Sequence, residues 1–88
     1  MYRFVYIYQG ITYESSAEYF KDGSHKRYKV MAPDGLAFII GRFGIPGVNG
    51  KIIWVQSNKP GEVMQPHDLV QAIGEGLEVE LRAKNIRF

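Results

Sequence analysis

The apolar residues of this chain fall mostly into short runs that alternate with polar residues or continue unbroken, which is typical of β-strands. The first run, residues 2–8, carries a ring at every even position: Tyr2, Phe4, Tyr6 and Tyr8. Successive side chains of a strand point to opposite faces. Residues 2–8 therefore predict a strand with one aromatic face and one mostly aliphatic face, and Gln9-Gly10 predicts a tight turn into a second strand.

The two longest apolar runs, within residues 36–43 and 51–57, do not alternate. A strand with one wet face alternates, so Phe38-Ile39-Ile40 and Ile52-Ile53-Trp54-Val55 predict strands that are covered on both faces. Between these runs, glycine recurs at every third position from Gly41 to Gly50. This spacing predicts a glycine-rich connection between the two strands.

Residues 14–22 have two interpretations. Ser15 to Glu18 matches a capping box, and Gly23 would then end a two-turn helix. Alternatively, Asp22-Gly23 is a hairpin turn that leads into a polar strand at residues 25–31. We favour the long hairpin, because so short a helix is marginal without packing.

The last part of the chain predicts one helix. Pro66 suits a first helical turn and Asp68 complements its positive end. The apolar residues at 69, 70, 73 and 77 form one stripe. Gly74 and Gly76 predict that the helix ends near residue 75, and the alternation of residues 77–82 predicts a strand. The alternative is a helix that continues to Lys84.

Together these segments predict one small α+β domain, residues 1–88, with five to six mostly antiparallel strands in meander order and one helix at about 66–75. A helix of about ten residues is only ~15 Å long and covers one face of a sheet. The strands that are apolar on both faces therefore predict one of two outcomes. The sheet curls into a small barrel, or its second face packs on another copy or a partner.

Composition narrows the function classes. The absence of cysteine excludes disulfides and thiolate metal sites. No apolar run approaches the ~20 residues of a membrane span, so we expect a cytoplasmic protein with no membrane contact. The formal net charge of +2, from 11 Lys and Arg against 9 Asp and Glu, favours polyanions only slightly.

The sequence predicts no enzyme. Its two histidines, His25 and His67, lie far apart, and one neighbouring carboxylate each does not make a metal site. The serines lie in turns or at strand ends, outside any nucleophile elbow. We therefore expect no catalytic residue, no metal and no cofactor.

Residues 39–44, Ile-Ile-Gly-Arg-Phe-Gly, resemble the Gly-x-x-Gly core of K-homology RNA-binding domains. In those domains the motif joins two helices. Here the preceding residues predict a strand, and Pro46, Gly47 and Gly50 would break a following helix. The sequence therefore favours a plain glycine-rich connection at this position.

The leading hypothesis is a small non-enzymatic interaction module that binds a second copy of itself or a protein partner through an aromatic sheet face or a strand edge. The residues predicted for that face are Tyr2, Phe4, Tyr6, Tyr8 and Tyr28. The alternative is a binder of single-stranded nucleic acid, which would use sheet aromatics for stacking and basic residues for phosphate contacts. The basic residues predicted for it are His25, Arg27, Lys29 and Arg42.

Overall fold

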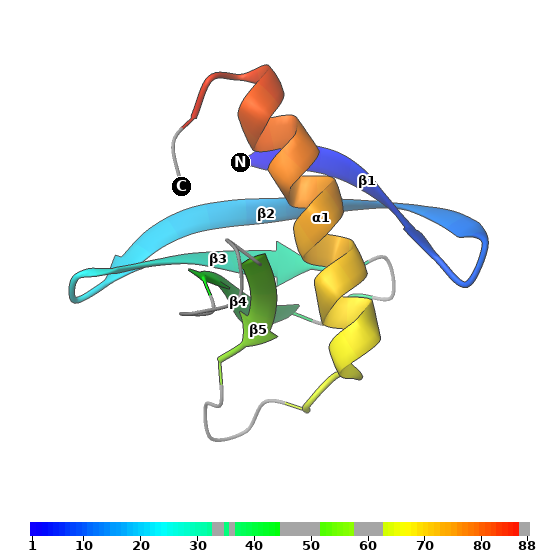
Figure 1. The fold of residues 1–88 in the computed structure, drawn as a ribbon, viewed down its shortest axis with the longest axis horizontal. Helices are drawn as coiled ribbons and strands as arrows, with labels where there is room; N and C mark the ends of the chain where they lie inside the picture. Colours follow the sequence, from blue (N-terminus) through cyan, green and yellow to red (C-terminus); the bar gives the residue numbers. More distant parts are fainter. Residues whose placement is uncertain (33–34, 36, 45–51, 58–62, 87–88) are drawn as a thin grey trace.

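A computed structural model of the chain describes residues 1–32, 35, 37–44, 52–57 and 63–86. Five strands precede one helix (Figure 1): β1 Tyr2–Tyr8, β2 Ile11–Asp22, β3 His25–Met31, β4 Ala37–Gly44, β5 Ile52–Gln56 and α1 His67–Ala83. The glycine-rich connection predicted after Gly44 lies outside the described residues.

The five strands form one antiparallel sheet in the order β1-β2-β3-β4-β5. The sheet curls into a half-barrel, so β5 runs steeply across the direction of β2 in Figure 1. The predicted α+β meander is thereby confirmed, and the sheet curls, although into a half-barrel instead of a closed barrel.

Two tight turns set the register of the first three strands. Gln9 and Gly10 have φ angles of 51° and 77°, the pair of left-handed residues that a two-residue hairpin turn of this kind requires. Gly23 has φ 63° directly after the last β2–β3 pair, Asp22 with His25. The long hairpin is therefore correct for residues 14–22, and the helix considered there does not form.

The helix differs most from the sequence-based prediction. It runs on to Ala83, so the strand predicted at residues 77–82 is wrong and the alternative of a continuing helix is right. The two glycines are contact points instead of a helix end. A Cβ on Gly74 would lie 1.9 Å from Cγ of Trp54, and one on Gly76 would lie 2.3 Å from the Val5 carbonyl oxygen. Only glycine permits α1 to approach the sheet so closely.

The core lies between α1 and the concave face of the sheet. Its helical side is the stripe Val70, Ile73, Leu77 and Leu81, each at most 1% exposed. The strands contribute one inward face each, and their largest fully buried side chains are Trp54, Tyr28, Ile40 and Val30. Among the described residues, no buried side-chain polar atom lacks a hydrogen-bond partner.

Both outer strands of the half-barrel are in contact with α1, which packs mainly against β1 and β5. At β5, the backbone N–H of Trp54 donates to Oε1 of Gln71 at 2.8 Å. The buried side chain of Gln56 accepts from the N–H of Gln65 and donates to the carbonyl of Val63, which ties the segment before α1 to β5. The Gln71 side chain thus occupies one backbone donor of the β5 edge, where an added strand would otherwise pair.

The first prediction concerns the glycine contacts. Alanine favours a helix interior over glycine by about 1 kcal/mol, yet Gly74→Ala and Gly76→Ala should each lower the free energy of unfolding by at least about 2 kcal/mol, because the added methyl group overpacks the contact. Chemical denaturation followed by circular dichroism measures this change.

Gly44→Ala is the matched control, since a Cβ there meets only Ile52 at an ordinary 3.9 Å. It should change the free energy of unfolding far less. If alanine at 74 or 76 stabilised the protein, α1 would not be seated as closely as these distances indicate.

Candidate functional site

The aromatic face of β1, Tyr2, Phe4, Tyr6 and Tyr8, lies toward α1. Phe4 and Tyr6 are 4% and 6% exposed, and Tyr2 and Tyr8 are half-buried against the same core. The hydroxyl of Tyr8 lies 3.3 Å from both carboxylate oxygens of Asp68 on α1. Partial burial and the Asp68 carboxylate both raise the pKa of Tyr8. In this structure the chain's own helix, instead of a partner, covers the predicted aromatic face, because α1 is longer than the sequence indicated.

A hollow of about 460 Å³ opens where β3 and β4 separate. The two strands pair only from Tyr28 with Ile40 to Met31 with Ala37, so residues 25–27 and 41–44 extend beyond the paired region. We call this the cationic hollow, lined by Ser24, His25, Lys26, Arg27, Tyr28, Arg42 and Phe43. Three of these side chains are cationic and none carries a carboxylate.

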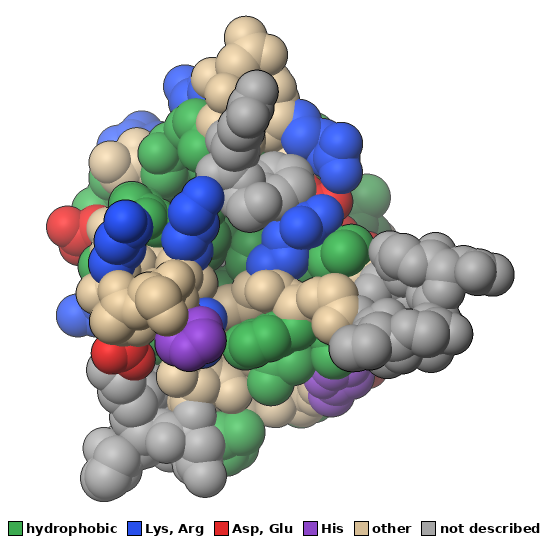
Figure 2. All heavy atoms as spheres, turned by 60° about the vertical axis from the view of Figure 1, so that its left-hand side comes forward, with side chains coloured by type: hydrophobic (Ala, Val, Ile, Leu, Met, Phe, Trp, Pro, Cys, Tyr) green, Lys and Arg blue, Asp and Glu red, His purple; other side chains and the backbone are tan. Residues whose placement is uncertain are grey.

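The space-filling view in Figure 2 shows several Lys and Arg side chains over this side of the molecule, with histidine and acidic side chains among them. The β2–β3 register adds another cation, because Lys21 lies directly opposite Lys26. Like charges that face each other across two strands are destabilising. The end of the hairpin therefore carries more basic than acidic side chains, with Asp22 opposite His25 as its acidic residue.

Arg27 is held in place at the cationic hollow. Its Nη1 donates to the Lys26 carbonyl at 3.1 Å, and its Cζ lies 5.0 Å from the centre of the Phe43 ring, a cation–π geometry. A Cβ on Gly41 would lie 2.8 Å from Nη1 of Arg27. The glycine thus makes room for the arginine to lie against β4 and reach Phe43, which is 37% exposed.

Arg42 connects the cationic hollow to the core. Its Nε donates to Oε1 of Glu78 at 2.8 Å, and the indole N–H of Trp54 donates to the same oxygen at 3.3 Å. Arg82 reaches the other carboxylate oxygen at 3.4 Å. Partial burial by itself raises the pKa of Glu78, but the hydrogen bonds and charge of Arg42, with Arg82 and Trp54, outweigh it and hold that pKa below its usual value.

Tyr28 also belongs to the core and is 2% exposed. Its ring centre lies 5.9 Å from that of Trp54 and 5.6 Å from that of Tyr19. Burial raises the pKa of Tyr28. This residue therefore contributes a packed floor to the cationic hollow more than an accessible ring.

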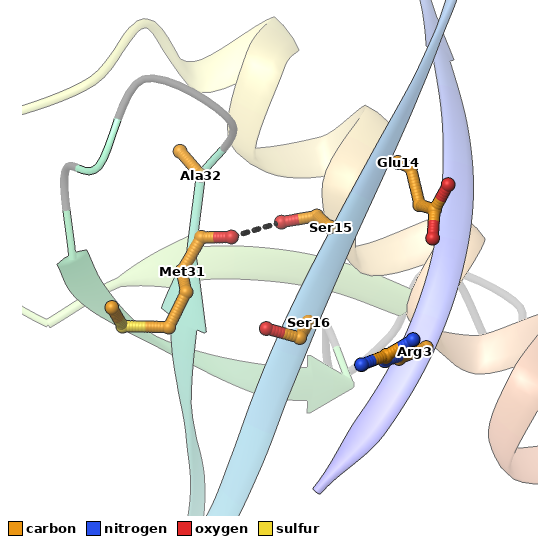
Figure 3. A pocket seen from close by; sticks show the side chains of 6 residues that line it. All are labelled: Arg3, Glu14, Ser15, Ser16, Met31 and Ala32. Atoms are coloured by element: carbon orange, nitrogen blue, oxygen red, sulfur yellow. Dashed lines mark hydrogen bonds between the residues drawn. The ribbon is translucent and has the colours of Figure 1, made fainter.

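A second hollow, of about 310 Å³, lies where β2 continues past the end of β3 (Figure 3). It is lined by Arg3, Glu14, Ser15, Ser16, Met31 and Ala32. The Ser15 side chain is held by a hydrogen bond, which its hydroxyl donates to the Met31 carbonyl. Figure 3 shows Arg3 and Glu14 on neighbouring strands, with the Glu14 carboxylate directed away from that bond. Neither has an ion pair or hydrogen bond within the described residues.

The four basic residues predicted for nucleic-acid binding are partly brought together. His25, Arg27 and Arg42 line the cationic hollow, whereas Lys29 lies farther along β3, opposite Glu18, and does not line it. The sequence analysis missed Lys26 and Phe43. The alternation of residues 25–31 places Lys26 and Arg27 on opposite faces of the predicted strand. Both nevertheless line one hollow, because β3 and β4 diverge there. We recognise no sequence signal that predicts this divergence.

Searches of protein-family models, of curated proteins and of solved structures return no significant match to this chain. In the described part of the chain, no helix is both long and apolar enough to cross a membrane. The same residues contain no group of three or more His, Asp or Glu side chains placed to hold a metal ion.

The second prediction concerns Glu78. Because its pKa is lowered in the folded state, the carboxylate contributes stability above its unfolded pKa, and that contribution is lost as the pH falls through the folded pKa. Glu78→Gln should cost about 1 kcal/mol at neutral pH and should flatten the loss of stability on the acid side. Urea unfolding at a series of pH values measures both effects.

Glu80→Gln provides the control on the same helix, since within the described residues the half-buried Glu80 pairs only with the exposed Lys84, at 3.4 Å. It should shift the free energy of unfolding by a few tenths of a kcal/mol. Equal effects of the two substitutions would mean that the Arg42–Glu78 contact adds nothing beyond a surface ion pair.

Proposed function

We propose that this protein is a small non-enzymatic interaction module that self-associates through the helix-free side of its first strands. We define the β1–β2 outer face by Arg3, Val5, Ile7, Glu14 and Met31. All five are exposed, and Val5, Ile7 and Met31 are apolar, at 58%, 65% and 40% exposure. Apolar side chains grouped on a sheet face and rimmed by charges are typical of protein–protein contacts.

The position of α1 supports this choice of surface. The helix covers the aromatic face. At β5, the side chain of Gln71 accepts from the backbone N–H of Trp54, and the side chain of Gln56 binds the segment before α1. In the part of the chain that the structure describes, no helix lies over Val5 and Ile7, the aliphatic side of β1. The sequence predicted the aromatic face or a strand edge for this contact; with α1 on the aromatic face, the opposite face of β1 is the better candidate for a partner.

The single observation that carries the proposal is the pair of opposite charges on one apolar face, Arg3 and Glu14, which have no ion-pair partner within the described residues. In a two-fold symmetric dimer, residue i of one copy meets residue j of the other, and j meets i. A second copy of this chain would bring its Glu14 to Arg3 and its Arg3 to Glu14 around Val5. The face is thus self-complementary in charge.

The size of the face sets the expected affinity. Stable dimers bury about 800 Å² on each partner, more than three apolar side chains provide. The charged residues around these apolar side chains must contribute to the buried area. The dimer should form only at concentrations of about 10 µM to about 1 mM.

The third prediction tests the reciprocal charges. Arg3→Glu and Glu14→Arg should each shift the monomer–dimer midpoint at least about tenfold upward, because each single variant places like charges across the dimer axis. An equimolar mixture of the two variants should dimerise again, since the mixed pair restores both opposite-charge contacts. Sedimentation velocity across the concentration range measures all three samples.

Glu18→Arg, on the same face of β2 but nearer the hairpin end, is the matched control and should leave the midpoint unchanged. A wild-type protein that stays monomeric throughout the range contradicts the proposal. So does a mixture that fails to recover association when both variants are folded by circular dichroism.

A further inference from the structure

We propose that the cationic hollow binds the sugar–phosphate backbone of single-stranded nucleic acid. This function is separate from self-association and uses different residues. The ligand class follows from three features of the cationic hollow, namely its charge, its aromatic floor and wall, and its continuation along the hairpin.

The charge comes first. Lys26, Arg27 and Arg42 line the cationic hollow together with His25, and Lys21 faces Lys26 across the hairpin. Glu78 accepts a hydrogen bond from Nε of Arg42 on the core side, but it does not line the cationic hollow. A phosphate oxygen placed there would accept charge-assisted hydrogen bonds from these side chains.

The aromatic groups distinguish nucleic acid from an acidic protein. Phe43 is accessible, and the Arg27 guanidinium lies over its ring. Nucleic-acid bases stack on aromatic rings and on guanidinium planes, and such contacts tolerate any base. A cation and a ring that are already held together provide a platform for one base beside the phosphate contact. A glutamate or aspartate side chain has no planar aromatic group to use it.

The extent of the charge favours a polymer over a single phosphate. Beyond the cationic hollow, the hairpin adds Lys21, opposite Lys26, and Lys29, which follows Arg27 on the same face of β3 and lies opposite Glu18. Several nucleotides of an extended strand could therefore contact cations in succession. An extended single strand can follow the open end of the hairpin, whereas a rigid duplex would contact it at fewer points.

The fourth prediction tests this ligand. A fluorescein-labelled mixed-sequence DNA oligonucleotide of about 12 nucleotides should bind with an affinity that falls steeply as salt rises. The double substitution Lys26→Gln/Arg27→Gln should weaken binding about tenfold at low salt and should reduce the salt slope by about 1.4, that is, about 0.7 for each lost phosphate contact. Fluorescence anisotropy titrations at several salt concentrations measure affinity and slope together.

The matched control is Arg82→Gln/Lys84→Gln, which removes the same two kinds of charge near the end of α1, where neither residue lines the cationic hollow. It should change the affinity less than twofold. Phe43→Leu should weaken binding with the salt slope unchanged, because it removes stacking and no charge. Circular dichroism melts confirm that each variant is folded.

Three results would overturn the proposal: no binding at low salt, equal losses in the two double variants, or equal affinity for polyglutamate and the oligonucleotide. Binding of inorganic phosphate as tight as that of the oligonucleotide would assign the cationic hollow to a small anion instead. Because Lys26 and Arg27 lie outside the β1–β2 outer face, these outcomes are distinct from a failure of self-association.

Discussion

The close seating of α1 on two glycines is the contact on which the other features of this structure depend. Gly74 lies against the Trp54 ring on β5, and Gly76 lies against the Val5 carbonyl on β1. These strands are the two ends of the meander, so the helix fills the concave side of a sheet that does not close on itself. A wider helix–sheet separation would leave the inward rings of β1 and the Trp54 indole partly wet, at a cost of about 25 cal/mol for each Å² of apolar surface left exposed.

The same seating positions the polar groups. It brings Glu78 to the indole N–H of Trp54 and to the guanidinium of Arg42, so one carboxylate connects helix, core and the wall of the cationic hollow. A half-buried cation is favourable only when a counter-charge and hydrogen bonds accompany it. Arg42 can therefore stand at the end of β4 because α1 supplies its partner. The Arg42–Glu78 interaction therefore contributes both to the cationic hollow and to the packing of α1.

Much of this arrangement could be predicted from the sequence, but the prediction assigned the wrong role to two glycines. Alternation in residues 2–8 placed the rings of β1 on one face, and the turn residues at 9–10 and 22–23 fixed the first hairpins. Gly74 and Gly76 are poor helix formers, so local propensity ended the helix eight residues early, and the packing against Trp54 and Val5 that overrides propensity is not visible in the sequence. That one error also left the aromatic face without its cover.

The candidate sites were harder to predict than the fold, because each depends on where two strands separate. Arg27 and Phe43 are distant in sequence and do not pair, and they meet only because β3 and β4 diverge beyond Tyr28 and Gly41 leaves room. Likewise, Met31 lines the same hollow as Arg3 and Glu14 only because β2 extends past the end of β3. Since His25 and Met31 begin and end β3, the two sites lie about 20 Å apart at ~3.3 Å per residue.

This separation has a consequence for how the two proposed activities would combine. A dimer formed through the β1–β2 outer face would leave both copies of the cationic hollow open, because that face shares no residue with the cationic hollow. Two linked hollows bind one polymer more tightly than either does alone, since the second contact is intramolecular, whereas a small anion gains nothing from the linkage. In the proposed dimer, the two hollows would therefore favour a long ligand over a short one.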